Sequence, residues 1–503
     1  IICYFLMSSM VMKKIVLLSR KSFLAKIQTH IAEIEINKIQ KNIIDTHYSS
    51  SVGDTDMSAK AWEQHGFGIF TNSLSKKLIL KDADVVVHSF KDLPVKNLNK
   101  TSFICLKRGD PRDVILIKKT SLNKKKLVIG TSSPRRKYYL KKLREFLPFE
   151  ELKPFDIRGN VPSRLEKILN SSKEDGVFMA KAAIDRIFKY GEKINKKDYR
   201  NFKLKFKKFE KIILPISEFP SAAAQGCIAL EYRRDDRKTE KILKKINHLP
   251  SLDDCQRERK YLYKWGGGCN LDVGVTIENI LNEKILFAQG KDNQTKKYFK
   301  EKKYLNNKKV KKVKNIFPSS LSKYQMFQRN LHEFNKTVKN KNVLATRSEF
   351  KEFKSLKSVS NLITSGVSSW KKISKMGILV NSSLDSFGEN YRETENFYKD
   401  NQKPTYKLTY EGNMLNKKFP VISHYSLVPL INDNTIDNLF VAESFYWMSF
   451  SAFKLAIQLR PEILNKRNSC GPGQTYLQIS KFIPKNQLNV YLTYDDFKNF
   501  ELK

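Results

Sequence analysis

Short runs rich in β-branched residues alternate along the chain with helix-like stretches. The runs occupy residues 14–19, 83–89, 126–133, 174–183 and 227–233. Strands that alternate with helices predict an α/β fold with largely parallel sheets. Several of the predicted strands end in Ser, Thr or Gly immediately before a helix, which is where open α/β sheets bind their ligands.

The composition narrows the class of protein without identifying a partner. The 503 residues predict about two to four domains, and the 40% hydrophobic content, with 32 Phe and 21 Tyr, excludes a wholly disordered chain. A formal charge of +43 favours a nucleic acid or an anionic membrane surface as partner. Lys and Asn recur along the whole length, however, as a coding bias would also produce, so the charge alone identifies no partner.

The cysteines and the N-terminus predict a soluble protein of a reducing compartment. The six cysteines form no CxxC pair and no Cys/His spacing, which argues against structural zinc and a disulfide framework. We interpret residues 1–12 as an extension upstream of the natural start. No apolar run reaches the roughly 18 residues that a membrane helix needs, so we expect a cytoplasmic protein, and we expect no metal site.

The first candidate site follows the buried run at 83–89. His88, Ser89, Lys91 and Asp92 come at its carboxyl end, and Pro94 prevents the strand from continuing. A carboxylate at such a point can stabilise a developing cation or move a proton. The alternative is a surface turn in which Lys91 and Asp92 only form a salt bridge with each other.

The second candidate is the segment IGTSSPRR at 129–136. Its Gly and hydroxyl residues, with Ser133 as helix cap and Pro134 at the first helical position, favour an anion at a helix N-terminus. Arg135 and Arg136 add two planar groups that match carboxylates or phosphates. A capped helix with solvated arginines is the alternative.

Two further strand ends carry similar side chains. Arg158 and Arg164 lie six residues apart where a strand is followed by a helix, and Arg20 and Ser22 follow the first strand. Single arginines at several strand ends predict a ligand with several carboxylates or phosphates. Such a ligand need not be a nucleic acid, because the arginines do not follow one helix face.

The last candidate is Cys269, which follows three glycines in the segment 265–274. A thiol on such a loop is accessible, so it can serve as a nucleophile or as a point of covalent attachment. The alternative is a flexible loop with an incidental cysteine.

Together these segments resemble the porphobilinogen deaminase (hydroxymethylbilane synthase) family over residues 13–335. The resemblance rests on the motifs VVVHSFKDLPV, GDPRDV, IGTSSPRR, IRGNVPSR, PSAAAQGCIALEYRRDD and ERKYLYKWGGGCNLDVG. It implies two periplasmic-binding-protein-like lobes, a small α/β domain and a covalently bound dipyrromethane cofactor. The implied domains are 13–110 with 211–235, then 111–210, then 236–335, followed by an additional α/β domain at 340–503.

The resemblance also implies an activity and a role for each candidate residue. Four porphobilinogen units would be deaminated and joined in turn on the cofactor, giving a linear tetrapyrrole and ammonia. Cys269 would carry the cofactor through a thioether, and Asp92 would be the catalytic carboxylate. The implied cofactor-binding side chains are Ser22, Lys91, Ser133, Arg135, Arg136 and Arg158. The implied substrate-binding side chains are Arg20 and Arg164.

The C-terminal region resembles fragments of uroporphyrinogen-III synthase at 361–391, 406–412 and 445–479. That family closes the linear tetrapyrrole with inversion of its last ring. The candidate features are Ser449 and Ser451 at a strand-to-helix turn, and a second anion-friendly turn at 471–475. The alternative is a divergent α/β appendage with structural serines.

We therefore expect an enzyme of porphyrin and heme synthesis, monomeric, acting on a small molecule, with neither nucleic acid nor membrane as partner. A deaminase with an inert C-terminal extension is the nearest alternative. A non-enzymatic two-lobed anion-binding protein would not need Cys269 or Asp92. A basic RNA-binding protein would leave both residues without a role and would bind with steep salt dependence.

Overall fold

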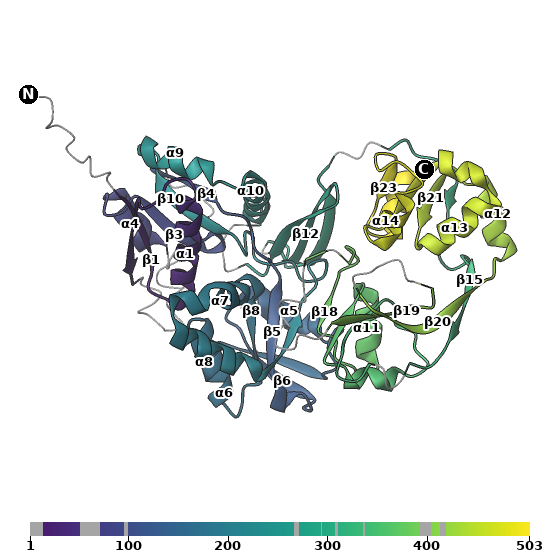
Figure 1. Ribbon diagram of the computed structural model, residues 1–503, viewed down its shortest axis with the longest axis horizontal. Helices are drawn as coiled ribbons and strands as arrows, with labels where there is room; N and C mark the ends of the chain where they lie inside the picture. The colour runs from purple at the N-terminus through teal and green to yellow at the C-terminus, as the bar shows by residue number, and fades with distance from the viewer. Residues whose placement is uncertain are drawn as a thin grey trace, which may run out of the picture.

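The computed structural model describes residues 14–50, 71–94, 99–265, 271–292, 294–306, 310–334, 338–389, 391–392, 404–412 and 419–503. These residues form five β-sheets with packed helices, arranged as two lobes, a small third domain and a C-terminal region (Figure 1). The predicted α/β fold class is therefore confirmed. Within the described residues, no helix is both long and apolar enough to cross a membrane.

The first lobe is built on a sheet of strand order β2-β1-β3-β10-β4. Its elements are β1 (Ile15–Arg20), α1 (Phe23–Asn37), β2 (Ile44–Ser49), α4 (Asn72–Ile79), β3 (Val85–Ser89), η1 (Phe90–Asp92), β4 (Thr101–Cys105), β10 (Ile228–Arg233) and α9 (Arg237–Lys245). β1 runs parallel to β2 and β3, so these strands end at one edge of the sheet, whereas β10 is antiparallel to β3 and β4. Leu17, Val85 and Val87 pack with Ala32 and Ile36 of α1 in the core of this lobe.

The second lobe has a similar sheet, of order β7-β6-β8-β5-β9. Its elements are β5 (Asp113–Lys118), η2 (Lys119–Ser121), β6 (Lys126–Gly130), α5 (Pro134–Leu143), β7 (Glu151–Phe155), α6 (Val161–Asn170), β8 (Gly176–Ala180), α7 (Lys181–Ile194), α8 (Lys196–Lys207) and β9 (Phe209–Ile213). β6 is parallel to β7 and β8, and β5 is antiparallel to β8 and β9. The chain crosses between the lobes twice, through residues 106–112 and 214–227.

The third domain is a helix on a three-stranded antiparallel sheet. It consists of α10 (Leu249–Tyr263), β11 (Gly274–Ile280), β12 (Glu283–Lys291) and β13 (Tyr298–Tyr304). Tyr261 and Leu262 of α10 pack on Val275 and Leu286 of the sheet. This packing holds α10 beside the second lobe crossing, because Val275 N also donates to the carbonyl of Ser221 at 2.9 Å.

The C-terminal region contains two sheets. The six-stranded one has the order β15-β20-β19-β16-β17-β18, and the four-stranded one the order β14-β21-β22-β23. The strands are β14 (Ile316–Phe317), β15 (Phe327–Leu331), β16 (Asn342–Ala345), β17 (Asn361–Thr364), β18 (Ser382–Ser383), β19 (Thr405–Tyr410), β20 (Val421–Pro429), β21 (Ser444–Trp447), β22 (Arg467–Cys470) and β23 (Leu488–Val490). The helices are η4 (Phe353–Ser358), α11 (Val367–Lys375), α12 (Asp433–Val441), α13 (Phe450–Leu459), η6 (Pro461–Asn465), α14 (Gln474–Ile479) and α15 (Tyr494–Glu501). All described strand pairs are parallel except β15 with β20.

The strand pairing differs from the boundary expected between 335 and 340. β14 and β15 lie before residue 335, yet they pair with β21 and β20 of the C-terminal sheets. The C-terminal region therefore begins after β13, and it has two sheets where a single additional domain was expected. The sequence of β15 does not reveal a strand, because four of its five residues are exposed and apolar and polar residues do not alternate.

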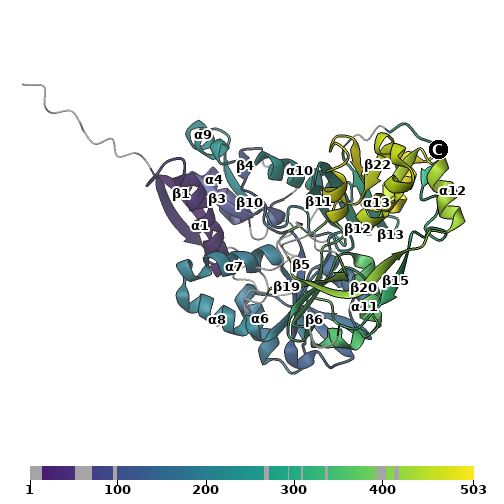
Figure 2. The ribbon, with the colours of Figure 1, turned by 45° about the vertical axis from the view of Figure 1, so that its right-hand side comes forward.

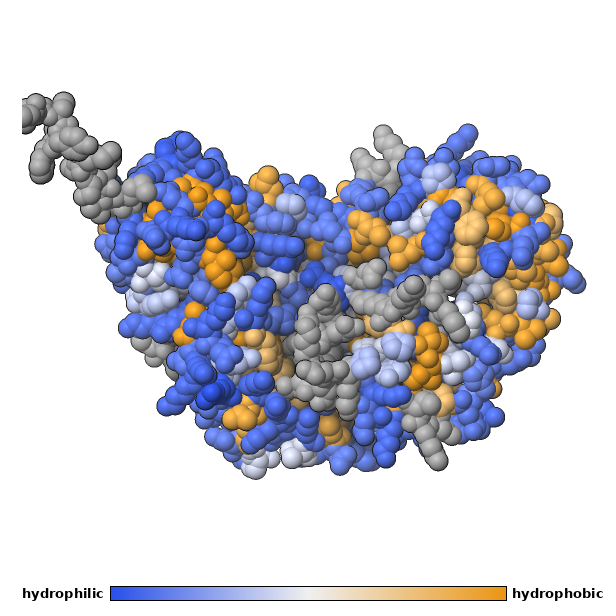
Figure 3. Space-filling model, in the orientation of Figure 1, coloured by the Kyte–Doolittle hydropathy of each residue, from blue (hydrophilic) through white to orange (hydrophobic). Residues whose placement is uncertain are grey.

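The C-terminal region packs directly on the second lobe (Figures 1 and 2). Trp370 and Val380 share one hydrophobic core with Phe146 and Phe219 of the second lobe and its crossing segment. The Trp370 indole N–H donates to the Phe146 carbonyl at 2.5 Å. On the opposite side, apolar residues gather over α12 and α13 (Figure 3), and Phe440 of α12 is 52% exposed. The region is thus docked through its six-stranded sheet.

Candidate active site

The first part of the site is the turn that carries Lys91 and Asp92. It follows β3 as the short helix η1, whose Phe90 is fully buried. Arg259 of α10 donates to the carbonyls of Phe90 and Leu93, at 3.2 and 2.9 Å, and its guanidinium lies over the Phe90 ring at 4.7 Å. The third domain therefore fixes the turn that presents Lys91 and Asp92.

The second part is the arginine pair at the start of α5. Arg135 and Arg136 are 4% and 7% exposed, so they are not the solvated arginines of the alternative interpretation. Arg135 Nη1 and Arg136 Nη2 contact the two carboxylate oxygens of Asp113, at 2.6 and 2.7 Å. Asp113 is itself fully buried at the start of β5. One carboxylate thus orients both guanidinium groups.

Gln225 connects these two parts across the lobes. Its side-chain nitrogen donates to Asp113 Oδ1 at 2.9 Å, and its oxygen accepts from Lys91 Nζ at 3.3 Å. A continuous polar chain therefore runs from Lys91 in the first lobe to the arginine pair in the second. Asp113 and Gln225 lie in the motifs GDPRDV and PSAAAQG, but no role was predicted for either.

The pKa shifts indicate a crowded cationic cluster around Asp92. Desolvation lowers the pKa of Lys91, and Asp92 opposes this effect. The pKa of Arg164 is lowered to about 10, first by burial and then by the charge of Arg136, while Asp92 again acts in the opposite direction. Arg158 also contributes to the lowering at Arg164, so these side chains lie within electrostatic range of one another.

At Asp113, neighbouring charges have a larger effect on the pKa than burial has. Burial alone raises the pKa of this carboxyl, but Arg135 and Arg136 outweigh burial and hold its pKa well below the usual range. Asp113 therefore remains charged and cancels part of the positive charge of the pair. We call this group of side chains the cationic cluster. Its cations outnumber its two carboxylates, Asp92 and Asp113, which favours an anionic ligand. The cations are Lys91, Arg135, Arg136, Arg158 and Arg164.

The other predicted residues lie at the expected strand ends. Arg20 ends β1, and Ser22 caps α1 by accepting from Ala25 N at 3.3 Å. Ser133 occupies the N-cap position of α5. His88, in contrast, points into the first lobe and contacts Glu231 Oε2 at 2.8 Å, with both side chains 2% exposed.

Comparison with known proteins covers the same part of the chain. Residues 15–241 match the family model described as "Porphobilinogen deaminase, dipyromethane cofactor binding domain". A probable porphobilinogen deaminase of Picrophilus torridus is 34% identical over 263 residues, which cover 51% of this chain and 83% of that protein. The porphobilinogen deaminase of a Nostoc species is 31% identical over 276 residues, covering 53% of this chain and 78% of that protein.

The chain belongs to the porphobilinogen deaminase family. It is thus a transferase of porphyrin synthesis that uses a dipyrromethane cofactor. A porphobilinogen deaminase needs cations for the carboxylates of its pyrroles, and the side chains described above carry positive charge. The residues fit the cofactor in a second respect, because the buried Nε of Arg136 has no hydrogen-bond partner among the described residues. A ligand carboxylate would satisfy this nitrogen.

Cys269 lies outside the described residues, as do the glycines that precede it. Gly274, at the start of β11, approaches the second crossing segment closely, since a Cβ there would clash with the Pro220 carbonyl and the Tyr139 hydroxyl. Arg135 Nη1 donates to that same carbonyl at 3.1 Å. The described strand that begins at Gly274 therefore lies next to the Pro220 carbonyl that Arg135 of the arginine pair contacts.

Proposed function

We propose that the N-terminal part of this deaminase holds its cofactor on Cys269 and binds the carboxylates of cofactor and substrate with the cationic cluster. We further propose that the C-terminal region is a uroporphyrinogen-III synthase that cyclises the linear product. The observation that carries the first proposal is the polar chain from Lys91 through Gln225 and Asp113 to the arginine pair.

The proposed roles follow from charge and position. Dipyrromethane, when bound, supplies the primer to which the pyrrole units are joined. Arg136 and Arg164 would bind carboxylates, because both are desolvated and Arg136 has an unsatisfied Nε among the described residues. Asp92 would accept from pyrrole N–H groups and place negative charge beside the carbon that loses ammonia. Lys91, held by Gln225, would bind a further carboxylate at the lobe boundary.

Intact mass of the purified full chain tests the attachment. We expect the wild-type mass to exceed the sequence mass by two pyrrole units, and we expect Cys269→Ala to lose this increment together with activity. Cys470→Ala is a matched control, since it removes a fully buried thiol of the C-terminal core. An unmodified but active wild-type protein would contradict the assignment of Cys269.

The second proposal rests on how the two C-terminal sheets face each other. Ser451, just after β21, donates to the hydroxyl of Tyr410 at the end of β19 at 3.4 Å. Glu389, after β18, contacts Gln474 at 3.3 Å and Lys407 at 2.5 Å. The carboxyl ends of both sheets thus meet, and such edges are where parallel sheets bind ligands. This arrangement supports a ligand site between the sheets.

Side chains of this junction suit a carboxylate-rich ligand. Ser449 caps α13 by accepting from Ala452 N at 3.2 Å, so the positive end of the helix dipole points toward the junction. Gly388 approaches the turn at 471–473 closely, because a Cβ there would clash with the Pro472 carbonyl. The hydroxyls of Ser451 and Tyr410 could orient a terminal pyrrole ring.

The isomer of the product tests the second proposal. Porphobilinogen is supplied to the full chain without any added synthase, and the macrocycle is analysed after oxidation. We expect the type III isomer, and we expect Tyr410→Phe to shift the product toward type I while porphobilinogen consumption is unchanged. Type I product alone from the wild-type chain would show that the C-terminal region is an inert extension.

A further inference from the structure

The two segments that cross between the lobes carry residues of the cationic cluster. The first, 106–112, leads directly into Asp113. The second, 214–227, contains Pro220, whose carbonyl accepts from Arg135, and Gln225, which contacts Asp113. Any movement of these segments therefore changes how the arginine pair faces Asp92 in the other lobe.

One part of the C-terminal region contacts both crossing segments. We name residues 384–389 with 391–392 the junction segment. Asp385 Oδ2 accepts from Ser217 N at 2.9 Å, and Asp385 Oδ1 also contacts the Ser217 hydroxyl. Tyr391 lies under the Arg112 guanidinium at 5.7 Å. The junction segment thus reaches 214–227 through Asp385 and 106–112 through Tyr391.

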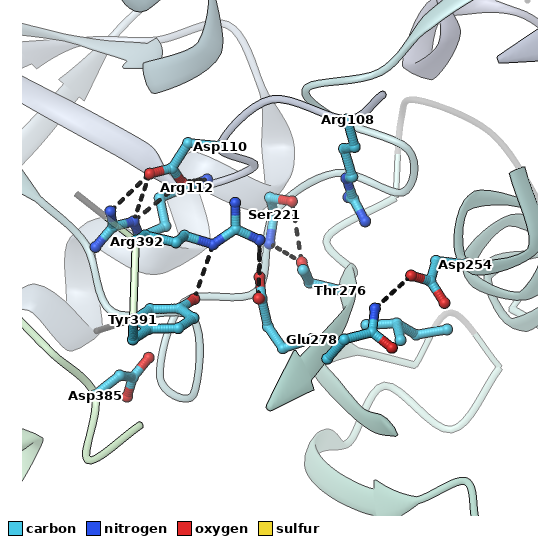
Figure 4. Close-up of polar contacts among 12 residues, drawn as sticks. Arg108, Asp110, Arg112, Ser221, Asp254, Thr276, Glu278, Asp385, Tyr391 and Arg392 are labelled. Atoms are coloured by element: carbon cyan, nitrogen blue, oxygen red, sulfur yellow. Dashed lines mark hydrogen bonds and ion pairs between the residues drawn. The ribbon is translucent and has the colours of Figure 1, made fainter. Parts of the chain in front are cut away.

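The third domain is attached to the same segment. Arg392 Nη2 donates to both carboxylate oxygens of Glu278 in β11, at 2.9 and 2.8 Å, and Glu278 is 2% exposed (Figure 4). Two residues earlier in β11, Thr276 Oγ1 accepts from Ser221 N at 2.8 Å. Arg392 therefore ties the C-terminal region to a strand that itself holds the second crossing segment.

The residues that the junction segment contacts lie close in the chain to the residues that hold the arginine pair. Arg112 precedes Asp113 in the chain, and its guanidinium is fixed by Asp110, with Nη2 to Oδ2 at 2.6 Å. Ser217 lies three residues before Pro220 in the turn after β9. Contacts at Tyr391 and Asp385 are therefore transmitted through short, buried pieces of backbone.

Further hydrogen bonds between the C-terminal region and the second lobe hold the elements that precede the junction segment in the chain. Ser374 of α11 donates to the Phe146 carbonyl at 2.6 Å, as Trp370 does from the same helix. Asn381, just before β18, accepts from Ile213 N at 2.8 Å, which continues the polar contacts of β9 into the C-terminal region. The junction segment is therefore held on a docked domain.

We propose that the junction segment is a hinge clamp, in which Asp385, Tyr391 and Arg392 are positioning residues of the deaminase reaction. By holding both crossing segments, the clamp sets the separation of the lobes and hence the distance between Asp92 and the cations of the second lobe. The ligand it accommodates is the growing, carboxylate-rich pyrrole chain. This inference rests on the deaminase site of the proposed function and is independent of the cyclisation.

The test uses the full chain with Arg392→Ala, the conservative Arg392→Lys and a control. Lys371→Ala is the control, because the Lys371 amine contacts Glu145 at 2.8 Å in the same interface, and Glu145 belongs to neither crossing segment. Porphobilinogen consumption is measured as kcat and KM separately. We expect Arg392→Ala to raise KM about three- to tenfold, Arg392→Lys to recover part of the loss, and Lys371→Ala to match the wild type.

A second measurement separates positioning from general damage. Intact mass during turnover resolves enzyme with one, two or three added pyrrole units, and we expect Arg392→Ala to change the proportions of these species. Tyr391→Leu, which leaves no buried charge unpaired, should act in the same direction and serves if Arg392→Ala does not fold. Equal KM and equal proportions in the wild type and both folded variants would overturn the clamp. An inactive wild-type chain would instead refute the proposed deaminase site.

Discussion

Two buried aspartates show how differently the deaminase site and the docking interface are built. Asp113, at the lobe boundary, is fully buried between Arg135 and Arg136, which hold its pKa well below the usual range against the effect of burial. Asp385, at the docking interface, is 4% exposed and is hydrogen-bonded by Ser217. Burial raises the pKa of Asp385 to about 6.

The difference indicates what each carboxylate contributes. At Asp113 the negative charge itself is needed, because it neutralises and orients two buried guanidinium groups. At Asp385 the hydrogen bonds join two segments, and the charge is an energetic cost, since its bonds come from the neutral Ser217. The charge of Glu218 raises the Asp385 pKa further, whereas the charge of Arg112 lowers it. Asp113 should therefore stay charged near neutrality, whereas Asp385 should change its protonation there.

Asp113→Asn should have the largest effect on both stability and activity. It leaves Arg135 and Arg136 buried without a counter-charge, which typically costs about 3–5 kcal/mol of unfolding free energy. Denaturant unfolding measures this loss, and porphobilinogen consumption should fall with it because Arg135 and Arg136 lose their orientation. Asp385→Asn is the matched control, since it should not destabilise the chain. Equal losses from both variants would erase the distinction between the two aspartates.

Asp92→Asn should lower the reaction rate with little change in stability. Asp92 is half-buried on η1, so we expect unfolding free energy to change by about 0.5 kcal/mol or less. The rate should fall on the order of 10²–10⁴-fold, because a neutral amide cannot stabilise the cationic centre. Asp235→Asn, on a carboxylate 70% exposed at the surface of the same lobe, should keep full activity. Near-normal turnover by Asp92→Asn would remove Asp92 from the mechanism.

Local pattern was enough to place half of the strands of the two lobes. The predicted runs at 14–19, 83–89 and 126–133 coincide with β1, β3 and β6, because apolar β-branched residues are continuous where a strand is buried on both faces. The prediction of largely parallel sheets holds only in part. β5 and β10 are antiparallel to their neighbours, since each follows a crossing from the other lobe.

Sequence pattern could not show which residues pair with the side chains of the cationic cluster. Gln225 and Asp113 are 112 residues apart, and they meet only because the chain crosses between the lobes twice. The junction segment was equally hidden. Arg392 and Glu278 lie 114 residues apart in different domains, and neither belongs to a motif with a recognisable chemical role. Residues that bear charge could be recognised, but not their pairing.

The last prediction has the opposite sign to that for Asp113→Asn, because here the substitution should make the chain more stable than the wild type above about pH 6. Because the folded-state pKa of Asp385 is raised from 3.8 to about 6, its protonated form is favoured by folding. This contribution to stability is complete below the unfolded pKa and is lost as pH rises through about 6. Between about pH 4 and 7, the wild-type chain should therefore lose about 1–3 kcal/mol relative to Asp385→Asn.

Denaturant midpoints of the wild type and Asp385→Asn, followed across this pH range, measure the effect directly. The side-chain amide introduced by Asp385→Asn would still accept from Ser217 N but would not titrate, so the midpoint of this variant should vary less with pH. If the hinge clamp transmits the ionisation of Asp385 to the lobes, the KM for porphobilinogen should rise with pH more steeply in the wild type than in the variant. Parallel pH profiles would mean that folding does not raise the pKa of Asp385, and Asp385 would then not differ from Asp113 in the way proposed.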